Sequence, residues 1–449
     1  MKKRKKPVET GLRLCVSEGD KKRGAGEEVA RIGKEIFFDP EILSTYRYDG
    51  WLPVHYDLLV VAAAVEYADR CKARRLTKWS RTFELSIPVS DYRNWSKIRV
   101  RESLEDALRQ LTGDAWHFTF EQGAGGATQA RQALLPFPKD QVKYTIAYSN
   151  GLDSRSVSGL YPVSEIVRVR VDGRKNRVCK NEKPFDLIPF HVKPSKSPEN
   201  SVRSRGFKFA AITAIASHLS GVDRVIVPES GQGALGPVLV PLHNIYPDYR
   251  NHPVFFRKME RFIEKLLGSS IAFQQPRLWH TKGETIAEYL RVGDGASVEG
   301  LLDTRSCWQQ RWNARINGKL GQCGLCAACM LRRMSLHAAG VTEPSEKYGF
   351  NDLSIATFKD AKPRSNRARP SKSMLEYGIA GVQHLEQLAR MAEWPDPSLT
   401  VAAFEIAQST GLSEAETLER LRDLLKRHAA EWRSFLDAQG KKSFIKGWI

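Results

Sequence analysis

The stretch VKYTIAYSNGLDSRSVSGLY, residues 142–161, decides how the central part of this chain folds. The apolar and aromatic run at 142–149 predicts a strand, and the run at 154–161 predicts a short helix. Between them, the turn SNGLDS at 149–154 brings backbone N–H groups and the start of a helix toward one point. Such a junction is typical of an anion site, because those N–H groups carry partial positive charge.

The residue types in this turn suit the binding of phosphate groups. Gly151 lets the backbone approach a ligand closely, Ser149 and Ser154 offer hydroxyl donors, and Asp153 can hold a metal ion or order the loop. The stretch is not a Walker A loop, because no Gly-Lys-Ser/Thr follows at the required spacing. Two structural alternatives stay open: an Asn-Gly β-hairpin turn and a Ser or Asp helix cap.

The regions on either side alternate between strand and helix patterns, which predicts an α/β protein with a parallel sheet. Before the turn we expect helices at 56–73 and at 103–113, with Ser103 as N-cap and Gly113 as the stop, and strands at 81–89 and 115–122. After it we expect strands at 165–171 and 223–228 and helices at 205–221 and 253–268.

A chain of 449 residues is long enough for more than one domain. We expect a series of consecutive segments: a basic mobile arm (1–30), an N-terminal α/β domain of unknown role (31–140), a central α/β domain that closes with a cysteine cluster (141–350), a basic linker rich in Pro and Ser (351–374) and a helical C-terminal region (375–449).

Charge is the unusual feature of the composition. The formal net charge is +19, whereas 41% hydrophobic and 27% charged residues are ordinary for a globular protein. The charge favours an anionic partner such as nucleic acid, a nucleotide or an acidic protein surface, and simple solubility is the alternative. No run approaches the roughly 18–20 apolar residues of a membrane span. No apolar segment follows the basic start MKKRKKPVETG, so we expect a cytoplasmic protein without a membrane partner.

Four of the seven cysteines gather in one short segment, at Cys307, Cys323, Cys326 and Cys329. Such a cluster in a reducing compartment predicts a metal site. Two overlapping C-x2-C steps let successive thiolates bend onto one tetrahedral ion, and Cys307 supplies the fourth ligand. Four thiolates without His fit a closed, structural Zn²⁺ site, and an iron–sulfur cluster is the alternative.

The SNGLDS turn resembles the SGGxDS loop with which the PP-loop ATP pyrophosphatases bind ATP, although Asn150 stands where that family usually has Gly. The segment CGLCAACMLRR, with Arg332 at the arginine position, is similar to one branch of that superfamily, QueC, the 7-cyano-7-deazaguanine synthases. Further stretches resemble QueC segments in the same order: RSRGFKFAAITAIASHL, VIVPESGQGALGP, YPDYR at 246–250 and HTKGETI. The likeness covers residues 142–345.

This resemblance implies a parallel-sheet, HUP-like PP-loop domain with a zinc-bound tetracysteine segment, and an ATP-dependent carbon–nitrogen ligase that uses Mg²⁺. It implies ATP binding by Ser149, Asn150, Gly151, Leu152, Asp153 and Ser154. It assigns catalysis to Asp153, Lys282 and Arg250, and substrate binding to Arg205, Glu229, Tyr246, Asp248, Arg250 and Glu284.

The implied reaction is adenylylation of a 7-carboxy-7-deazaguanine-like substrate and its transfer to ammonia or to an amine of a partner. The added N- and C-terminal segments resemble the longer, QatC-type members found in anti-phage operons, which implies protein partners from the same operon. Two alternatives stay open. One is a PP-loop enzyme that modifies tRNA, which the charge favours, and the other is a catalytically degenerate nucleotide-binding scaffold of a defence complex.

Overall fold

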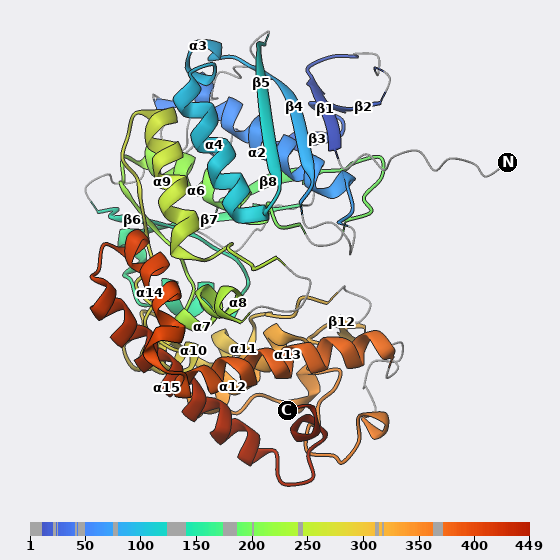
Figure 1. The fold of residues 1–449 in the computed structure, drawn as a ribbon, viewed down its shortest axis with the longest axis vertical. Helices are drawn as coiled ribbons and strands as arrows, with labels where there is room; N and C mark the ends of the chain where they lie inside the picture. Colours follow the sequence, from blue (N-terminus) through green and yellow to red (C-terminus); the bar gives the residue numbers. More distant parts are fainter. Residues whose placement is uncertain are drawn as a thin grey trace, which may run out of the picture. The chain divides into compact units, whose positions relative to one another are not determined.

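The computed structural model of this chain describes residues 11–20, 24, 26–40, 43, 50–74, 80–123, 141–173, 186–199, 202–240, 246–309, 314–316, 318–361 and 371–449 (Figure 1). The chain divides into two compact units. We call them the sheet unit (Met1–Ala147, Ser164–Val227 and His243–Gln274) and the helical unit (Tyr148–Val163, Pro228–Leu242 and Gln275–Ile449). The units alternate along the sequence, whereas we had expected consecutive domains.

The sheet unit contains a four-stranded, fully parallel sheet in the order β2-β1-β4-β5. Its strands are β1 (Gly11–Ser17), β2 (Glu27–Arg31), β4 (Thr82–Val89) and β5 (Ala115–Gln122). The expected strands at 81–89 and 115–122 are confirmed. The expectation of a mobile arm is wrong for 11–17 and 27–30, because these residues lie in β1 and β2, and β1 buries Leu14 and Val16 in the core of this unit.

A second sheet of the same unit has six strands in the order β10-β9-β6-β7-β8-β3. They are β3 (Ile36–Phe38), β6 (Tyr144–Ala147), β7 (Ile166–Asp172), β8 (Asp186–Val192), β9 (Arg224–Ile226) and β10 (Ala272–Gln274). All neighbours run parallel except β3, which is antiparallel to β8. The expected parallel sheet is thus confirmed, with β6, the strand that precedes the SNGLDS turn, in its interior.

Five described helices belong to the sheet unit: α2 (Pro53–Cys71), α3 (Tyr92–Trp95), α4 (Ile98–Thr112), α6 (Arg205–Ser220) and α9 (Pro253–Leu267). Helix α2 contacts β1 and β4 of the first sheet, β3 and β8 of the second, and α6, which explains why it is buried on nearly all sides. The expected N-cap at Ser103 is wrong, because α4 starts earlier and the Ser103 hydroxyl donates to Arg99 O at 2.8 Å. Gly113 does end this helix, in the left-handed conformation.

A buried network of ions joins four elements of the sheet unit. Arg81 donates to Asp69 Oδ1 at 2.5 Å and to Asp114 Oδ2 at 2.7 Å, and Arg74 donates to Asp114 Oδ2 at 2.8 Å. The other oxygen of Asp69 accepts from the backbone N of Ser204 at 2.8 Å, directly before α6. The two carboxylates and Arg81 are at most 3% exposed, so their charges depend on one another.

The helical unit comprises α5 (Leu152–Ser158), α7 (Gly231–Ala234), α8 (Gly236–Leu239), α10 (Lys282–Val292), α11 (Val298–Leu302), α12 (Ala327–Ala338), α13 (Lys372–Arg390), α14 (Asp396–Thr410), α15 (Glu414–Ala438) and a short hairpin of β11 (Arg315–Ile316) and β12 (Lys319–Leu320). The expected helical C-terminal region is confirmed. Helix α15 packs against α12, α13, α14 and the short helix α7.

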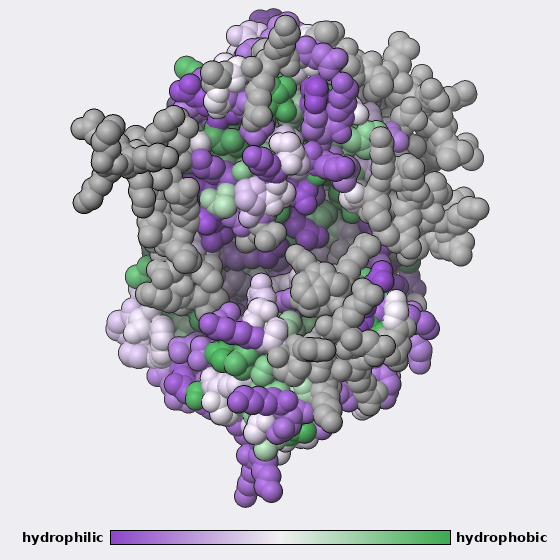
Figure 2. Space-filling model, turned by 90° about the vertical axis from the view of Figure 1, so that its right-hand side faces the viewer, coloured by the Kyte–Doolittle hydropathy of each residue, from purple (hydrophilic) through white to green (hydrophobic). Residues whose placement is uncertain are grey.

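Figure 2 shows mostly hydrophilic residues on the face that it draws, with apolar residues scattered singly or in small groups. Such scattered apolar side chains are normal for a folded protein in water. Within the described part of the chain, no helix combines the length and the apolar character that a membrane span needs.

Candidate active site

The turn at 149–154 closes on itself through its two serines. The backbone N of Ser149 donates to Ser154 Oγ at 3.1 Å, the two hydroxyl oxygens lie 3.0 Å apart, and the N of Gly151 donates to Ser149 Oγ at 3.1 Å. Asn150 O accepts from the backbone N of Arg305 at 2.7 Å. A Cβ on Gly151 would lie 3.0 Å from Ser149 Oγ, so glycine suits the tightness of the turn.

The turn leads from a strand into a helix. Helix α5 begins at Leu152, two residues before the predicted start, with Gly151 as its N-cap. Strand β6 pairs in parallel with β7 and β9, and not with a strand that follows the turn directly. The β-hairpin alternative is therefore wrong, and the strand–turn–helix junction is confirmed.

Asp153, Glu229 and Lys282 form one cluster inside the helical unit. Lys282 Nζ donates to Asp153 Oδ2 at 2.6 Å and lies 3.5 Å from Glu229 Oε1. The three side chains are only 10–19% exposed. Three segments that are distant in the sequence thus bring one cation and two carboxyl groups together.

Burial and neighbouring charge set the protonation of this cluster. Burial, followed by repulsion from Asp153, raises the pKa of Glu229 to about 8. Burial by itself would lower the pKa of Lys282, but Asp153 and Glu229 outweigh it and raise that pKa. Near pH 7 the cluster therefore holds an ammonium group at Lys282 and a largely protonated carboxyl group at Glu229.

Glu284 serves the start of α10, although the resemblance implied a substrate contact. Its carboxylate accepts from the backbone N of Thr281 at 2.8 Å, and the Thr281 hydroxyl accepts from the N of Glu284 at 3.1 Å. This reciprocal pair is a capping box, and it places Lys282 at the first position of the helix. Arg427 of α15 lies 3.3 Å from the other Glu284 oxygen.

The sequence reasoning did not identify two buried neighbours of this helix start. Gln232 Oε1 accepts from the backbone N of Lys282 at 2.7 Å, and Glu431 of α15 accepts a hydrogen bond from the Thr281 hydroxyl. The capping box could have been found from the T-x-x-E spacing in HTKGETI. No local signal links Glu431 to residues about 150 positions earlier.

The other predicted substrate residues lie in the sheet unit. Asp248 accepts from Arg250 in a bidentate pair, at 3.0 Å on Oδ1 and at 2.5 Å on Oδ2, and the Tyr246 hydroxyl donates to Gln110 O at 2.7 Å. Arg205 begins α6, and burial followed by the charge of Arg250 lowers its pKa. Arg205, Asp248 and Arg250 therefore form a second, mainly cationic group of side chains.

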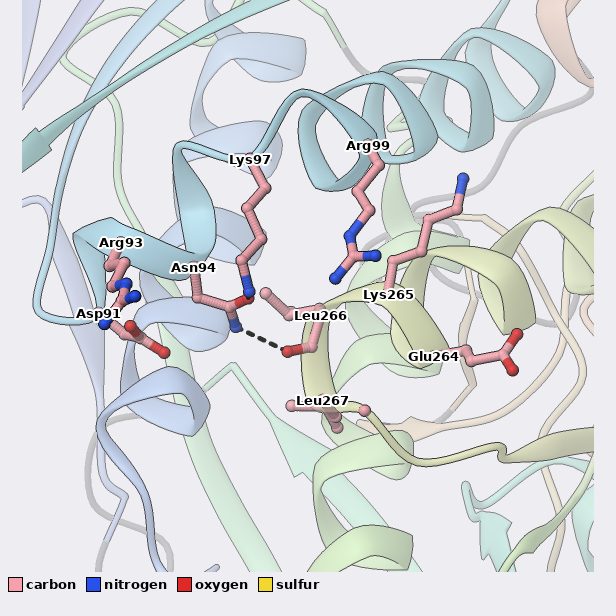
Figure 3. A pocket seen from close by; sticks show the side chains of 10 residues that line it. Asp91, Arg93, Asn94, Lys97, Arg99, Glu264, Lys265, Leu266 and Leu267 are labelled. Atoms are coloured by element: carbon pink, nitrogen blue, oxygen red, sulfur yellow. Dashed lines mark hydrogen bonds between the residues drawn. The ribbon is translucent and has the colours of Figure 1, made fainter.

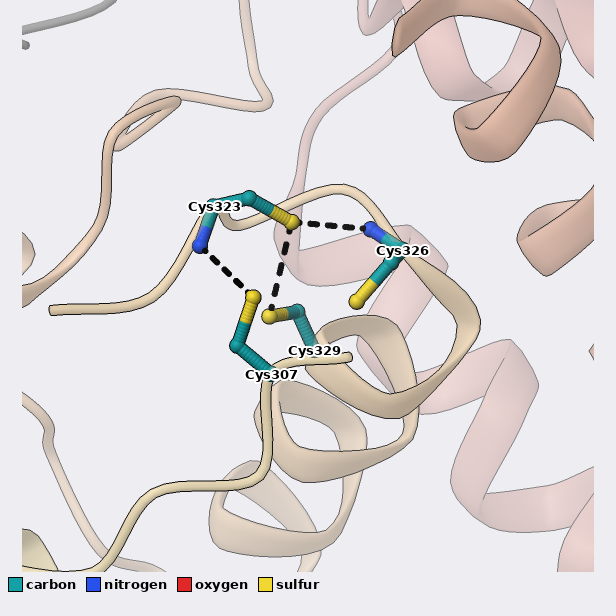
Figure 4. Close-up of side chains that lie close together, drawn as sticks. All are labelled: Cys307, Cys323, Cys326 and Cys329. Atoms are coloured by element: carbon teal, nitrogen blue, oxygen red, sulfur yellow. Dashed lines mark hydrogen bonds between the residues drawn. The ribbon is translucent and has the colours of Figure 1, made fainter. Parts of the chain in front are cut away.

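The four clustered cysteines converge as predicted (Figure 4). Their sulfur atoms all lie within 4.8 Å of one another, and each residue is at most 6% exposed. Backbone N–H groups of Cys323, Leu325 and Cys326 point at the sulfur atoms of Cys307 and Cys323, at 3.3–3.4 Å. Four buried sulfurs, two of which accept backbone N–H bonds, fit a structural Zn²⁺ ion held by thiolates.

The chain beside the cysteines is fixed by a turn and by an ion pair. Gly324 has φ of +90°, and a Cβ there would collide with Phe350 O, so the CGLC step needs glycine. Arg332 is buried and donates to Glu343 at 2.8 Å and to the Thr304 hydroxyl at 2.6 Å. The arginine of the motif therefore ties α12 to the loops around the cysteines.

A separate open cleft of about 590 Å³ lies in the sheet unit. Figure 3 shows Lys97 and Arg99 extending from the start of α4 toward the end of α9, where Asn94 Nδ2 donates to Leu266 O at 2.8 Å. The charged residues that line it are Arg93, Lys97, Arg99 and Lys265, together with Asp91 and Glu264. None of the predicted site residues lines this cleft.

Comparisons with known proteins point to one family. Residues 193–340 match the family model described as queuosine biosynthesis protein QueC. A 7-cyano-7-deazaguanine synthase of Desulfitobacterium hafniense is 25% identical over 172 residues, which are 37% of this chain and 64% of that protein. The enzyme of the same name from Agrobacterium fabrum is 33% identical over 105 residues, 23% of this chain and 39% of that protein.

The extent of these matches is limited. The chain spans about two fifths to two thirds of the length of these relatives, and no solved structure matches it significantly. The family model covers Glu229, Lys282 and the four cysteines, whereas the turn at 149–154 lies outside it. Residues 193–340, with their buried tetracysteine cluster, are thus similar to the QueC family.

Proposed function

We propose that this protein is an ATP-dependent synthetase that activates the carboxylate of a 7-deazaguanine and transfers it to ammonia or to an amine of a partner. The contact of Lys282 with Asp153 and Glu229 carries the proposal, because it joins the SNGLDS turn to residues of the QueC-like region. The names of the relatives support the same substrate class.

In the first step, an oxygen of the substrate carboxylate attacks the α-phosphorus of ATP. The bond from that phosphorus to the bridging oxygen breaks, and pyrophosphate leaves. The proposal assigns the pyrophosphate to the backbone N–H groups and hydroxyls of 149–154, and the charge that develops on the phosphates to Lys282. Mg²⁺ supplies further positive charge when it is bound, and Asp153 is its proposed carboxylate ligand.

In the second step, an amine nitrogen attacks the acyl carbon, the bond to AMP breaks, and the nitrogen loses a proton to a base. The proposal assigns recognition of the deazaguanine to Arg205, Tyr246, Asp248 and Arg250. Bidentate Asp248–Arg250 pairing orients the Asp248 carboxylate. Glu284 is left out of this set, since its carboxylate caps α10.

The test is pyrophosphate release from ATP and Mg²⁺, with and without 7-carboxy-7-deazaguanine, for the wild type and the double variant Ser149→Ala/Asp153→Ala. Release that depends on the substrate and is lost in the double variant supports the proposal. Binding of ATP without any release would favour the alternative of a nucleotide-binding scaffold, in which Asn150 replaces the usual Gly.

The second part of the proposal to test is the amine that accepts the activated carboxylate. The chain contains β1, β2, β4, β5 and α13–α15 outside the matched region, and these segments support a partner amine from a protein of the same defence operon. If the purified protein formed free 7-cyano-7-deazaguanine efficiently from ammonium alone, this part of the proposal would be given up.

A second candidate function is the modification of tRNA, which the basic cleft at Lys97, Arg99 and Lys265 and the net charge of +19 favour. Binding through phosphate contacts weakens steeply as salt rises. Affinity for tRNA should then fall with salt and should fall further in the variant Lys97→Ala/Arg99→Ala. Affinity that is unchanged by these substitutions would count against this candidate.

A further inference from the structure

A single buried amide links the short helix α7, the start of α10 and helix α15. Gln232 Oε1 accepts from the backbone N of Lys282 at 2.7 Å. Its Nε2 lies 3.0 Å from His428 Nδ1 and donates to Glu431 Oε2 at 3.1 Å. Gln232 is 3% exposed and His428 is fully buried, so water does not compete for these bonds.

The donors and acceptors of this network fit together in one arrangement. His428 Nε2 lies 2.9 Å from Leu385 O, which can only accept, so that nitrogen carries the proton and Nδ1 accepts from Gln232. The two Gln232 N–H groups therefore point at His428 and Glu431, and its oxygen points at Lys282. Flipping the amide would place an N–H donor against the N–H of Lys282.

Helix α15 also reaches the start of α10 directly. Glu431 accepts a hydrogen bond from the hydroxyl of Thr281, the N-cap of α10. A Cβ on Gly283 would lie 2.6 Å from Glu431 Oε1 and 2.8 Å from Ala338 Cβ, so the backbone approaches α15 and α12 closely here. Contacts with other helices therefore hold the first turn of α10 on both sides of Lys282.

We infer that Gln232 and Glu431 are positioning residues, through which helix α15 holds Lys282 against Asp153. The inference rests on the proposed function only in taking Lys282 as the residue that meets the phosphates of ATP. Both residues act on the backbone and the cap of α10 and touch no atom that reacts. Helix α15 lies outside the QueC-like region, so this chain makes its site depend on a segment that the family model does not cover.

The variants follow from the pattern of donors and acceptors. Glu431→Gln either places an amide donor against Gln232 Nε2 or takes away the acceptor of the Thr281 hydroxyl, and Gln232→Leu removes the acceptor for Lys282 N. The double variant Gln232→Glu/Glu431→Gln exchanges the two groups and restores all the bonds once His428 takes a second proton. Glu419→Gln, an exposed change of the same type on α15, is the matched control.

Two measurements are made on the full-length protein. The first is the rate of Lys282 acylation by acetic anhydride, relative to the exposed Lys372, by mass spectrometry. The second is pyrophosphate release. We expect each single variant to raise the relative labelling of Lys282 several-fold and to lower kcat/KM about 10- to 100-fold. A displacement of a catalytic group by about 1 Å can slow a reaction by such a factor. The double variant should recover at least half of each change on a logarithmic scale, and Glu419→Gln should match the wild type.

Failure of this inference can be distinguished from failure of the proposed function. Labelling of Lys282 that stays at the wild-type level in both single variants would overturn the inference, even if the melting temperature fell, since that result indicates a role in stability alone. Equal loss in the single and double variants would overturn it as well. Should the wild type release no pyrophosphate, the proposed function fails, and the labelling series still decides whether α15 positions Lys282.

Discussion

Lys282 Nζ lies 2.6 Å from Asp153 Oδ2, although 129 positions separate the two residues in the sequence. Asp153 belongs to the helix that follows the SNGLDS turn, and Lys282 is the first residue of α10. Glu229, 3.5 Å from Lys282, adds a third segment to the same cluster. Two short stretches of sequence, SNGLDS and HTKGETI, thus meet at one ion pair.

Replacing Lys282 by Met should lower pyrophosphate release about 100-fold or more, because the buried cation that we assign to the phosphates of ATP is lost. The same change leaves Asp153 and Glu229 together without their counter-ion, which raises the pKa of Glu229 further. Turnover assays with ATP check this. Lys372→Met is the control, since that side chain is 89% exposed. Unchanged turnover in Lys282→Met would remove Lys282 from the mechanism.

Replacing Glu229 by Gln should change how stability depends on pH. The pKa of Glu229 is raised from 4.5 to about 8 by burial and by Asp153, so the folded protein keeps a proton that the unfolded chain releases. The contribution of this group is fully present below about pH 4.5 and is lost as pH rises through about 8. From about pH 6 to pH 8.5, the melting temperature of the wild type should therefore fall relative to that of Glu229→Gln. Parallel curves would contradict the shifted pKa.

Replacing Cys323 by Ser should abolish metal binding and lower the melting temperature, because structural zinc contributes directly to folding. Elemental analysis should find about one zinc per wild-type chain and little in the variant. Cys71→Ser, outside the cluster, should keep the metal. Iron and inorganic sulfide in place of zinc would support the alternative of an iron–sulfur cluster.

Replacing Arg81 by Met should destabilise the protein by about 3–5 kcal/mol, because Asp69 and Asp114 then stay buried without this partner. Urea unfolding checks the size of the effect. Arg13→Met serves as control, since its pair with Glu84 is 70% and 53% exposed and contributes about 1 kcal/mol at most. Similar losses of unfolding free energy in the two variants would show that the buried network stabilises the protein no more than an exposed ion pair does.

Local patterns predicted the regular elements well where one periodicity dominated. The helices at 205–221 and 253–268 and the strands at 81–89 and 115–122 follow from spacing of apolar residues, which is a property of neighbours in the chain. Strand β1 was missed because its seven residues lie in a charged and Gly-containing region, and its burial comes from pairing with β2 and β4. The sequence predicts Ser103 as an N-cap, whereas the helix begins at Ile98, about one turn earlier.

The sequence by itself determined which residues can do chemistry: four cysteines at metal-binding spacing, a strand–turn–helix with two serines, and a lysine in the stretch HTKGETI. These depend on residue type and short spacing, which are fixed along the chain. Only the tertiary structure decided that Lys282 meets Asp153 and Glu229, and that Gln232 of α7 and Glu431 of α15 hold the start of its helix. Such contacts join residues about 50 to 150 positions apart, and they arise from the packing of whole helices, which no local pattern encodes.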